Sequence, residues 1–177
     1  MTDADLFEAF VRRYQDMVFA TAVRLLGNPT EAEDVAQTVF LRAFQRFEEL
    51  GPSPTAAGWL KTVTRNTCLN HLSRYRRRWR FFSELATTDD TSEEFEQREI
   101  VSVQPSITED LEHAERQQQL ERALRQLPDH QRVPLVLFHF EDLSYQAIAT
   151  ALGVSLGKVK TDIHRGREAL RQLMGEE

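Results

Sequence analysis

Apolar residues recur every three or four positions through both ends of this 177-residue chain. This spacing places them along one side of an α-helix, where they can pack against other helices. The pattern predicts helices over about residues 3–26, 30–47, 55–79, 108–127 and 129–140. No run alternates apolar and polar residues in the way that a half-buried strand does. The sequence therefore predicts an all-α fold.

Turn and cap residues indicate where several of these helices end. Gly27-Asn28-Pro29 is expected to stop the first helix. Thr30 and Glu33 have the spacing of a capping box, which predicts that the second helix begins at Thr30. Gly51-Pro52-Ser53-Pro54 predicts a loop, because two prolines remove backbone donors. Pro134 is expected to lie in the first turn of its helix or to bend it.

Charge is distributed unevenly along the chain, which has a net charge of −6. Residues 1–80 have a net charge of +3, residues 81–110 of −8 and residues 111–177 of −1. The acidic middle segment also loses the helical periodicity, and such a composition buries too little apolar surface to order itself. The sequence therefore predicts two small helical domains, 1–80 and 111–177, joined by a flexible acidic linker over 81–110.

Several function classes are excluded by what the sequence lacks. Cys68 is the single cysteine, so neither a disulfide framework nor a CxxC site can form, and its apolar surroundings predict a core position. The chain has no HExxH, GxxxxGK[ST], GxGxxG or GxSxG motif. We therefore expect no catalytic residues, no metal, no cofactor and no enzymatic activity. An acidic N-terminus and the lack of a long apolar run predict a cytoplasmic protein without membrane insertion.

The segment from Leu143 to Arg167 has the pattern of a helix-turn-helix. Ala149 supplies the small residue at the helix crossing, and Gly153 tolerates the positive φ of the turn. Ser144 and Ser155 are expected to cap the two helices. The second helix is predicted to expose residues suited to phosphates and base edges in a major groove. These are Lys158, Lys160, Thr161, His164, Arg165 and Arg167.

Nearly the whole chain resembles the extracytoplasmic-function (ECF) group of bacterial RNA polymerase sigma factors, in the sigma-70 superfamily. In the C-terminal half the resemblance lies in Leu127-Pro128 and in residues 141–149 and 157–167. In the N-terminal half it lies in residues 31–40 and in the segment from Trp59-Leu60 through Asn66 to the arginine run at 74–80.

The resemblance implies a role for each half of the chain. Residues 1–80 would be sigma region 2, which binds core polymerase and both recognises and melts the −10 promoter element. Residues 111–177 would be region 4, whose recognition helix binds the −35 element. Implied partners are core RNA polymerase, through its β′ clamp helices and β flap, promoter DNA, and an anti-sigma factor or other regulator.

The resemblance also assigns individual residues in the N-terminal half. Those implied to contact polymerase are Asp34, Gln37, Thr38, Phe40 and Arg42. Those implied to contact −10 DNA are Trp59, Arg65, Asn66, Arg74, Arg76, Arg77 and Arg78.

Three positions depart from what such a protein would need. Thr38 stands where the family usually has an acidic residue. Asp162 places an acid on the helix expected to face DNA, where it would repel phosphate unless it accepts a hydrogen bond from a cytosine amino group. Gly166 within the same helix predicts either a close approach to another backbone or an early helix end.

Two other functions are compatible with the motifs. A conventional helix-turn-helix repressor or activator would bind duplex operators, usually as a dimer and without polymerase. A pure interaction module would bind only a regulator, and the basic residues of both halves disfavour it.

Overall fold

The computed structural model describes residues 1–72 and 107–175, with side chains from Leu111 onward in the second range. The regular elements in these ranges are all α-helices, which confirms the predicted fold class. The N-terminal part contains α1 (Asp3–Leu26), α2 (Pro29–Gln45), the short α3 (Phe47–Leu50) and α4 (Ala56–His71). The C-terminal part contains α6 (Ile107–Gln126), α7 (Asp129–His139), α8 (Tyr145–Leu152) and α9 (Leu156–Leu173).

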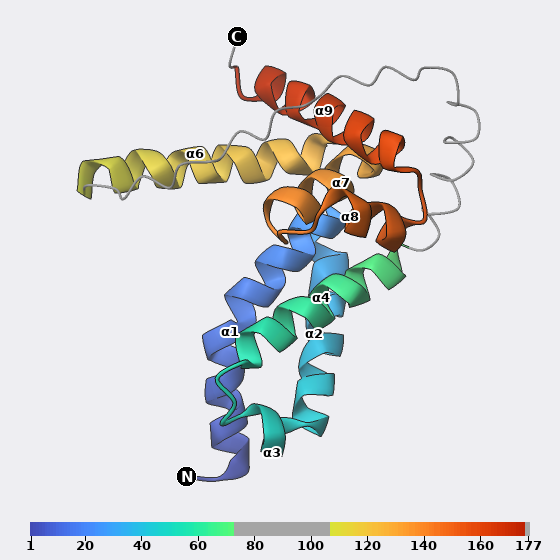
Figure 1. The fold of residues 1–177 in the computed structure, drawn as a ribbon. Helices are drawn as coiled ribbons and strands as arrows, with labels where there is room; N and C mark the ends of the chain where they lie inside the picture. Colours follow the sequence, from blue (N-terminus) through green and yellow to red (C-terminus); the bar gives the residue numbers. More distant parts are fainter. Residues whose placement is uncertain (73–106, 176–177) are drawn as a thin grey trace.

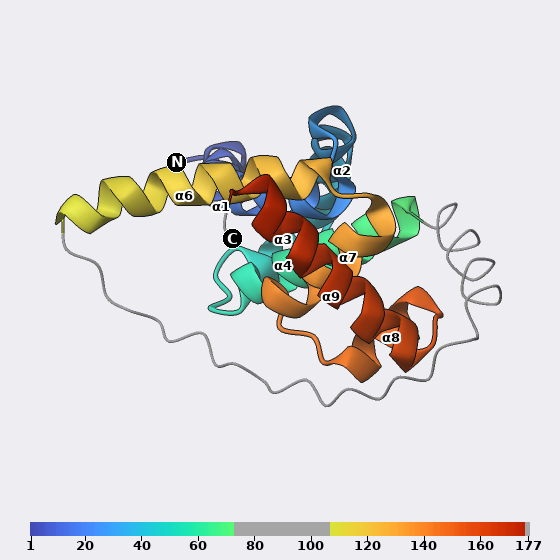
Figure 2. The same ribbon diagram turned by 90° about the horizontal axis from the view of Figure 1, so that it is seen from above.

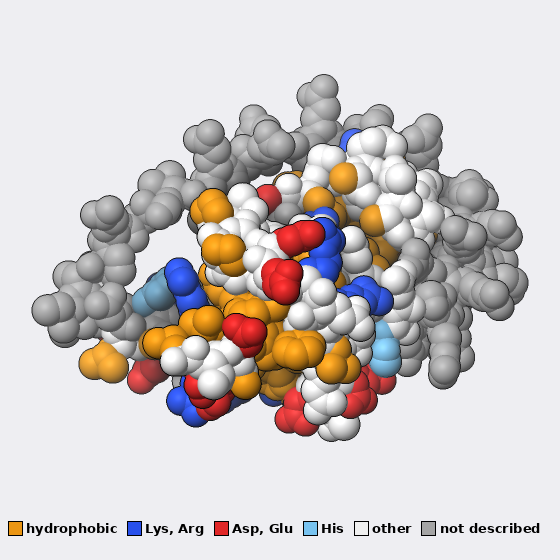
Figure 3. All heavy atoms as spheres, turned by 90° about the horizontal axis from the view of Figure 1, so that it is seen from below, with side chains coloured by type: hydrophobic (Ala, Val, Ile, Leu, Met, Phe, Trp, Pro, Cys, Tyr) orange, Lys and Arg blue, Asp and Glu red, His pale blue; other side chains and the backbone are white. Residues whose placement is uncertain are grey.

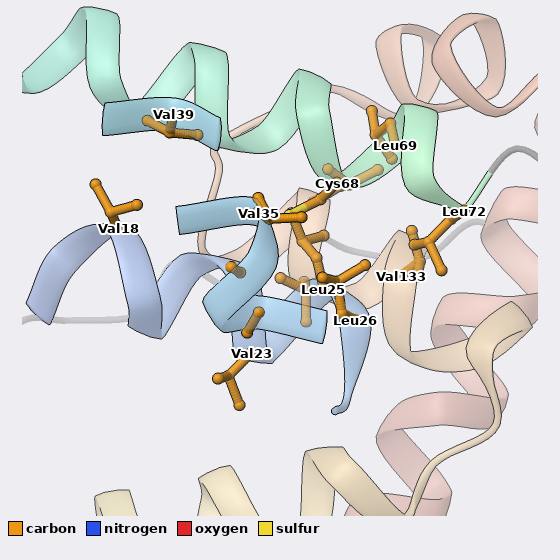
Figure 4. Close-up of a cluster of buried hydrophobic side chains, with 14 of the residues drawn as sticks. Val18, Val23, Leu25, Leu26, Val35, Val39, Cys68, Leu69, Leu72 and Val133 are labelled. Carbon is orange, nitrogen blue, oxygen red and sulfur yellow. The ribbon is translucent and has the colours of Figure 1, made fainter. Parts of the chain in front are cut away.

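The N-terminal part is a packed group of three long helices, α1, α2 and α4 (Figure 1). Their apolar stripes meet in a common core, which includes Val18, Leu25, Val39, Leu60 and Cys68, all fully buried. Figure 4 shows several of these side chains pointing toward one another. The burial of Cys68 confirms its predicted core position.

The first helix has the predicted end, whereas the second helix has a different start. Gly27 ends α1 with a φ of 69°, a conformation that glycine adopts without a steric penalty. The N-cap of α2 is Asn28, whose Oδ1 accepts hydrogen bonds from the amides of Thr30 (2.9 Å) and Glu31 (3.3 Å). The predicted Thr30 cap is therefore wrong. Pro29 fits the first helical position because an N–H there would have no partner within the helix.

The C-terminal part contains the predicted helix-turn-helix, formed by α8 and α9. Ser144 accepts a hydrogen bond from the Ala147 amide (3.1 Å), and Ser155 accepts one from the Lys158 amide (3.2 Å), so both caps are confirmed. Gly153 has a φ of 68° in the turn between the helices, as expected.

Helix α9 crosses α7 closely at Gly166. A β-carbon on Gly166 would lie 3.3 Å from the Gln131 carbonyl oxygen and 3.1 Å from Leu135 Cδ1. This confirms the predicted close approach, and the helix continues to Leu173. Pro134 is buried well inside α7 rather than in its first turn. The helix therefore lacks one backbone hydrogen bond at that point.

The two parts of the chain pack against each other in one continuous core. Val133 of α7 lies near Leu25 and Leu26 at the end of α1 and near Leu72 (Figure 4). Helix α6 extends away from this body over most of its length (Figures 1 and 2). The sequence periodicity predicted the long helices, but it predicted neither the short α3 nor this packing.

Candidate functional site

Helix α9 has one buried side and one exposed side, and the exposed side is basic. Val159, Ile163 and Gly166 are buried, so residues on the opposite side of the helix face outward. Lys160, Thr161 and Arg165 are exposed and His164 is half-exposed. Four of the six predicted DNA contacts therefore share one accessible surface, which we call the α9 face (Lys160, Thr161, His164 and Arg165).

Lys158 lies at the edge of the buried side and forms an ion pair there. Its Nζ lies 2.6 Å from Asp162 Oδ2, and the two side chains are 15% and 8% exposed. Burial raises the pKa of Asp162, whereas the hydrogen bond from Lys158 lowers it. Asp162 therefore lies on the buried side of α9 and not on its exposed side. The residue falls three positions after Val159 and four before Gly166, on the buried stripe of the helix.

The Arg167 side chain also contacts a neighbouring helix, α7, and is only partly exposed. Its Nε donates to His139 Nε2 on α7 (3.1 Å), and its guanidinium carbon lies 5.6 Å from the centre of the Phe138 ring. Burial and the charge of Arg167 both lower the pKa of His139, which keeps the imidazole neutral and able to accept this bond. Arg167 therefore positions α9 against α7.

Helix α2 exposes most of the residues predicted to contact polymerase. Asp34, Gln37, Thr38 and Arg42 are exposed, and Phe40 is half-buried. The Thr38 hydroxyl donates to the Asp34 carbonyl oxygen (3.1 Å). Arg42 Nη1 donates to Thr67 Oγ1 on α4 (3.4 Å). This hydrogen bond orients the Arg42 side chain toward α4.

Two large apolar side chains on α2 were missed by the sequence analysis. Leu41 is 65% exposed and Phe44 is 59% exposed. They follow Gln37 by four and seven positions, which places all three on one side of the helix. We call Asp34, Gln37, Leu41 and Phe44 the α2 face. Figure 3 views the molecule from below, the side on which Figure 1 draws α3 and the C-terminal end of α2. Hydrophobic side chains are gathered on this side, with acidic residues around them.

A signal for these residues was present in the sequence. Val39, Phe40, Leu41, Ala43 and Phe44 form an apolar run too wide for one side of a helix. Part of such a run must face solvent or a partner. The Phe44 ring also lies edge-on to Phe7, with centroids 5.0 Å apart, which holds it at the surface.

The predicted −10 contacts are divided between described and undescribed residues. Trp59 is half-buried against the core, and the Arg46 guanidinium carbon lies 6.0 Å from its ring centre. Asn66 is exposed and Arg65 is half-buried on the same helix, α4. Arg74, Arg76, Arg77 and Arg78 lie outside the described residues.

Within the described ranges, no three His, Cys, Asp or Glu side chains lie close enough together to hold a metal ion. Burial, with a smaller effect from the charge of Glu141, raises the pKa of the Cys68 thiol to about 12. None of the helices in the same ranges has the length and hydropathy needed to cross a membrane.

The chain matches two protein-family models, one in each half. Residues 10–78 match Sigma-70 region 2, and residues 117–170 match Sigma-70, region 4. The first match contains the α2 face and the second contains the α9 face. The chain therefore belongs to the sigma-70 family of transcription factors.

Similarity to individual proteins shows to which group of the sigma-70 family the chain belongs. The chain is 35% identical over 171 residues to the ECF RNA polymerase sigma factor SigE of Mycolicibacterium smegmatis, covering 96% of this chain and 62% of that protein. It is 31% identical over 170 residues to the ECF RNA polymerase sigma factor SigW of Bacillus subtilis, covering 96% of this chain and 89% of that protein. The chain is a member of the ECF group of sigma factors.

A solved structure is similar at lower identity. It is the sigma factor RpoE in complex with the anti-sigma factor NepR from Bartonella quintana, with a TM-score of 0.49 and 23% identity. The match covers 96% of each chain.

Proposed function

We propose that this chain binds core RNA polymerase and directs it to promoters with specific −35 and −10 elements. The observation that carries this proposal is the α2 face, where Leu41 and Phe44 are more than half exposed beside Asp34 and Gln37. Exposed apolar side chains next to polar groups are typical of a protein-binding surface. This surface lies inside the match to Sigma-70 region 2. Its proposed partner is the clamp-helix region of the β′ subunit.

The proposed polymerase contacts extend beyond the α2 face. Thr38 and Arg42 are exposed beside it, and Phe40 supports it from a half-buried position. We assign region 2 to residues 1–80 and region 4 to residues 111–177, joined by residues 81–110. The β flap is the proposed polymerase partner of region 4.

The α9 face is the proposed −35 reader. Lys160 and Arg165 supply positive charge, and Thr161 and His164 supply hydrogen-bonding groups between them. Lys158 and Arg167 act mainly by holding α9 in place, since both are bonded to buried or half-buried partners.

Helix α4 and the arginines that follow it are the proposed −10 reader. Asn66 and Arg65 would contact the separated strand, and Trp59 would support a pocket for a flipped base from its half-buried position. Arg74, Arg76, Arg77 and Arg78 would bind the phosphate backbone and make promoter binding sensitive to salt.

In this proposal the chain acts in the cytoplasm as a transcription initiation factor. It does not itself catalyse a reaction. An anti-sigma factor or another regulator is a further proposed partner. The conventional repressor or activator is disfavoured, because a protein that binds operators alone has no need of a Sigma-70 region 2.

Co-elution with core RNA polymerase on gel filtration tests the proposal. The wild-type chain should co-elute, whereas Asp34→Ala combined with Gln37→Ala should lose co-elution and keep its helical circular dichroism. Arg165→Ala is the matched control, since it alters an exposed residue on the α9 face and should co-elute normally. Tight binding of the free chain to duplex DNA without any co-elution would favour the repressor instead.

A further inference from the structure

Lys158 and Arg167 are the two predicted −35 contacts that lie outside the α9 face, and their partners differ in charge. Lys158 pairs with the carboxylate of Asp162, and both side chains are largely buried. Arg167 instead donates from Nε to the imidazole Nε2 of His139 (3.1 Å). No carboxylate in the described part of the chain forms an ion pair with Arg167. The charge of Lys158 is therefore neutralised, whereas that of Arg167 is not.

The imidazole of His139 is neutral in this contact. An arginine Nε always has a proton and can only donate, so Nε2 of His139 is the unprotonated acceptor. Burial and then the charge of Arg167 lower the pKa of His139. Arg167 is the charged group that faces it from α9, while Tyr145 on α8 and the following Glu141 and Asp142 are other titratable groups at this end of α7.

The Phe138 ring limits the rotation of the same guanidinium. Its centre lies 5.6 Å from Cζ of Arg167. The ring is held in turn by Tyr145 of α8, which stacks on it with centroids 4.7 Å apart, and by the ring of His139, which meets it edge-on at 5.0 Å. Two contacts with α7, one at Nε and one at the ring, therefore fix the orientation of the guanidinium.

The two terminal nitrogens of Arg167 remain available to a ligand. Among the residues that the structure describes, none forms a hydrogen bond with Nη1 or Nη2, and Arg167 is partly exposed. The terminal nitrogens of a guanidinium form a fork that matches the oxygens of a phosphate group. A fork that is oriented before binding loses less conformational freedom when it binds. These features suit Arg167 to a phosphate of DNA.

Arg167 also lies in line with two residues of the α9 face. It follows Lys160 by seven positions and His164 by three, and residues seven apart lie nearly one above the other on a helix. Seven positions span about 10 Å of helix axis. This exceeds the rise of roughly 3.4 Å between successive phosphates of one strand. Lys160 and Arg167 are therefore far enough apart to contact separate phosphates.

We propose that His139 is a positioning residue for −35 recognition, which presents the terminal nitrogens of Arg167 to a DNA phosphate by accepting a hydrogen bond from Nε. The proposal rests on the −35 function proposed above for α9. A carboxylate at position 139 would hold the arginine as well but would neutralise it. Arg167 thus has two roles, because it holds α9 against α7 through Nε and binds DNA through Nη1 and Nη2.

Nuclear magnetic resonance of the free full chain tests the contact without DNA. The imidazole nitrogens of His139 are followed by ¹⁵N shifts during a pH titration. Arg167→Ala should raise the pKa of His139, because it removes a positive charge beside the ring. Arg125→Ala, at an exposed arginine on α6, is the matched control and should leave this pKa unchanged. An unchanged pKa in Arg167→Ala would overturn the proposal.

Promoter binding by the chain in complex with core polymerase tests the phosphate contact. The probe is a labelled duplex selected with the wild-type complex from a random-sequence library. Arg167→Ala and His139→Leu should each weaken binding about 10-fold and reduce the salt slope by about one. The double variant should bind as tightly as either single variant, because all three lack the same contact. His113→Leu, at an exposed histidine on α6, is the matched control and should bind like the wild type.

His139→Gln separates positioning from packing. The amide oxygen can accept from Arg167 Nε, and the amide does not titrate. At about pH 7.5 this variant should bind the duplex within about two-fold of the wild type. As the pH falls below 6.5, the wild-type imidazole gains a proton, stops accepting and repels Arg167. The wild type should then bind more weakly than His139→Gln.

The histidines other than His139 are the same in both proteins, so the ratio of the two affinities reports on His139 alone. A ratio that does not change with pH would overturn the proposal. So would a His139→Gln variant that binds as weakly as His139→Leu.

Arg165→Ala distinguishes failure of this inference from failure of the proposed function. Weak binding by Arg165→Ala, together with normal binding by Arg167→Ala and His139→Leu, would overturn the role of His139 and leave the −35 function intact. A wild-type complex that selects no duplex would contradict the −35 function, and the role of His139 would be overturned with it.

Discussion

Helices α2 and α9 are both surface helices with one buried stripe, yet their exposed sides differ. The α2 face combines Leu41 and Phe44 with one acid and one amide. The α9 face combines two cations with Thr161 and His164, and between residues 157 and 168 the exposed side of α9 has no large apolar side chain. The same helical geometry thus presents two surfaces of opposite character.

The difference indicates what each surface binds. Apolar area removed from water is the main source of affinity between proteins, and a few central side chains supply most of it. Nucleic acid offers a charged backbone, so affinity for it depends on cations and on released counterions. The pattern of buried residues alone would not show that the two helices bind different partners. The composition of their exposed sides does indicate it.

The largest expected effect is that of a charge placed in the α2 face. Leu41→Glu should weaken binding to core polymerase about 100-fold, because it puts a carboxylate where an apolar side chain would be buried. Fluorescence anisotropy with labelled core measures the change. Leu111→Glu, at a leucine that is 72% exposed on α6, is the control and should bind within a few-fold of wild type. Equal losses in both variants would contradict the assignment of the α2 face.

The next largest expected effect is a difference in salt dependence between the two surfaces. Promoter binding by the α9 face should weaken with salt much more than polymerase binding by the α2 face. Lys160, Arg165 and Arg171 are exposed cations on α9. Three phosphate contacts would lower promoter affinity at least about 40-fold between 50 and 200 mM salt. Binding of the chain to core polymerase should change much less, because the α2 face is partly apolar. Parallel titrations of both equilibria measure this, and equal salt slopes would remove the distinction between the faces.

Two cations on α9 should behave differently when each is replaced by alanine. Arg165→Ala should weaken promoter binding about 10-fold without changing the melting temperature, because Arg165 is exposed. Lys158→Ala should instead lower stability by about 1 to 3 kcal/mol, because it leaves the buried Asp162 unpaired. Gel-shift titrations and thermal melts measure the two effects. The reverse pattern would place Lys158 in the DNA surface.

The smallest expected effect is that of Glu141, a buried residue between the N-terminal and C-terminal parts of the chain. Burial raises the pKa of Glu141, whereas Lys61, Arg65 and Arg24 lower it and Asp142 raises it further. A raised pKa means that the folded protein binds this proton more tightly than the unfolded chain does. The stability it contributes is therefore present at low pH and is lost as the pH rises from about 4.5 through the raised value.

Glu141→Gln removes this titration. The variant should melt at or slightly above the wild-type temperature at pH 7, by about 2 °C or less, and should lose the acid-side dependence. Melting curves between pH 4 and 8 measure it, with Glu112→Gln at an exposed glutamate as the control. A large loss of stability at pH 7 would mean that attraction to the three cations outweighs burial.

Local features of the fold could be predicted from the sequence. Ser144, Gly153 and Ser155 were assigned correctly because a cap or turn depends on residues within three or four positions. Thr30 failed because two local signals competed, and the Asn28-Pro29 pair was the stronger one. Gly166 was predicted correctly because a glycine inside a helix has few explanations other than a close approach.

Side-chain roles at the candidate site were harder to predict because they depend on contacts distant in the sequence. Arg167 bonds to His139, which lies 28 positions away, and Arg132 bonds to carbonyls more than 100 positions away. No local pattern specifies such pairs. The burial of Asp162 was within reach, however, since the residue lies on the same stripe as Val159 and Gly166.

Gly27 should stand out in a scan of all single substitutions. Both obstacles at this position, the φ of 69° and the guanidinium of Arg132, act on the first carbon of any side chain. Residues with a β-carbon should therefore be disfavoured at this position, chiefly because the φ of 69° strains them. Gly58 and Gly157 have open space around them and should accept small residues. A mutational profile should thus register the close fit between Gly27 at the end of α1 and Arg132 of α7.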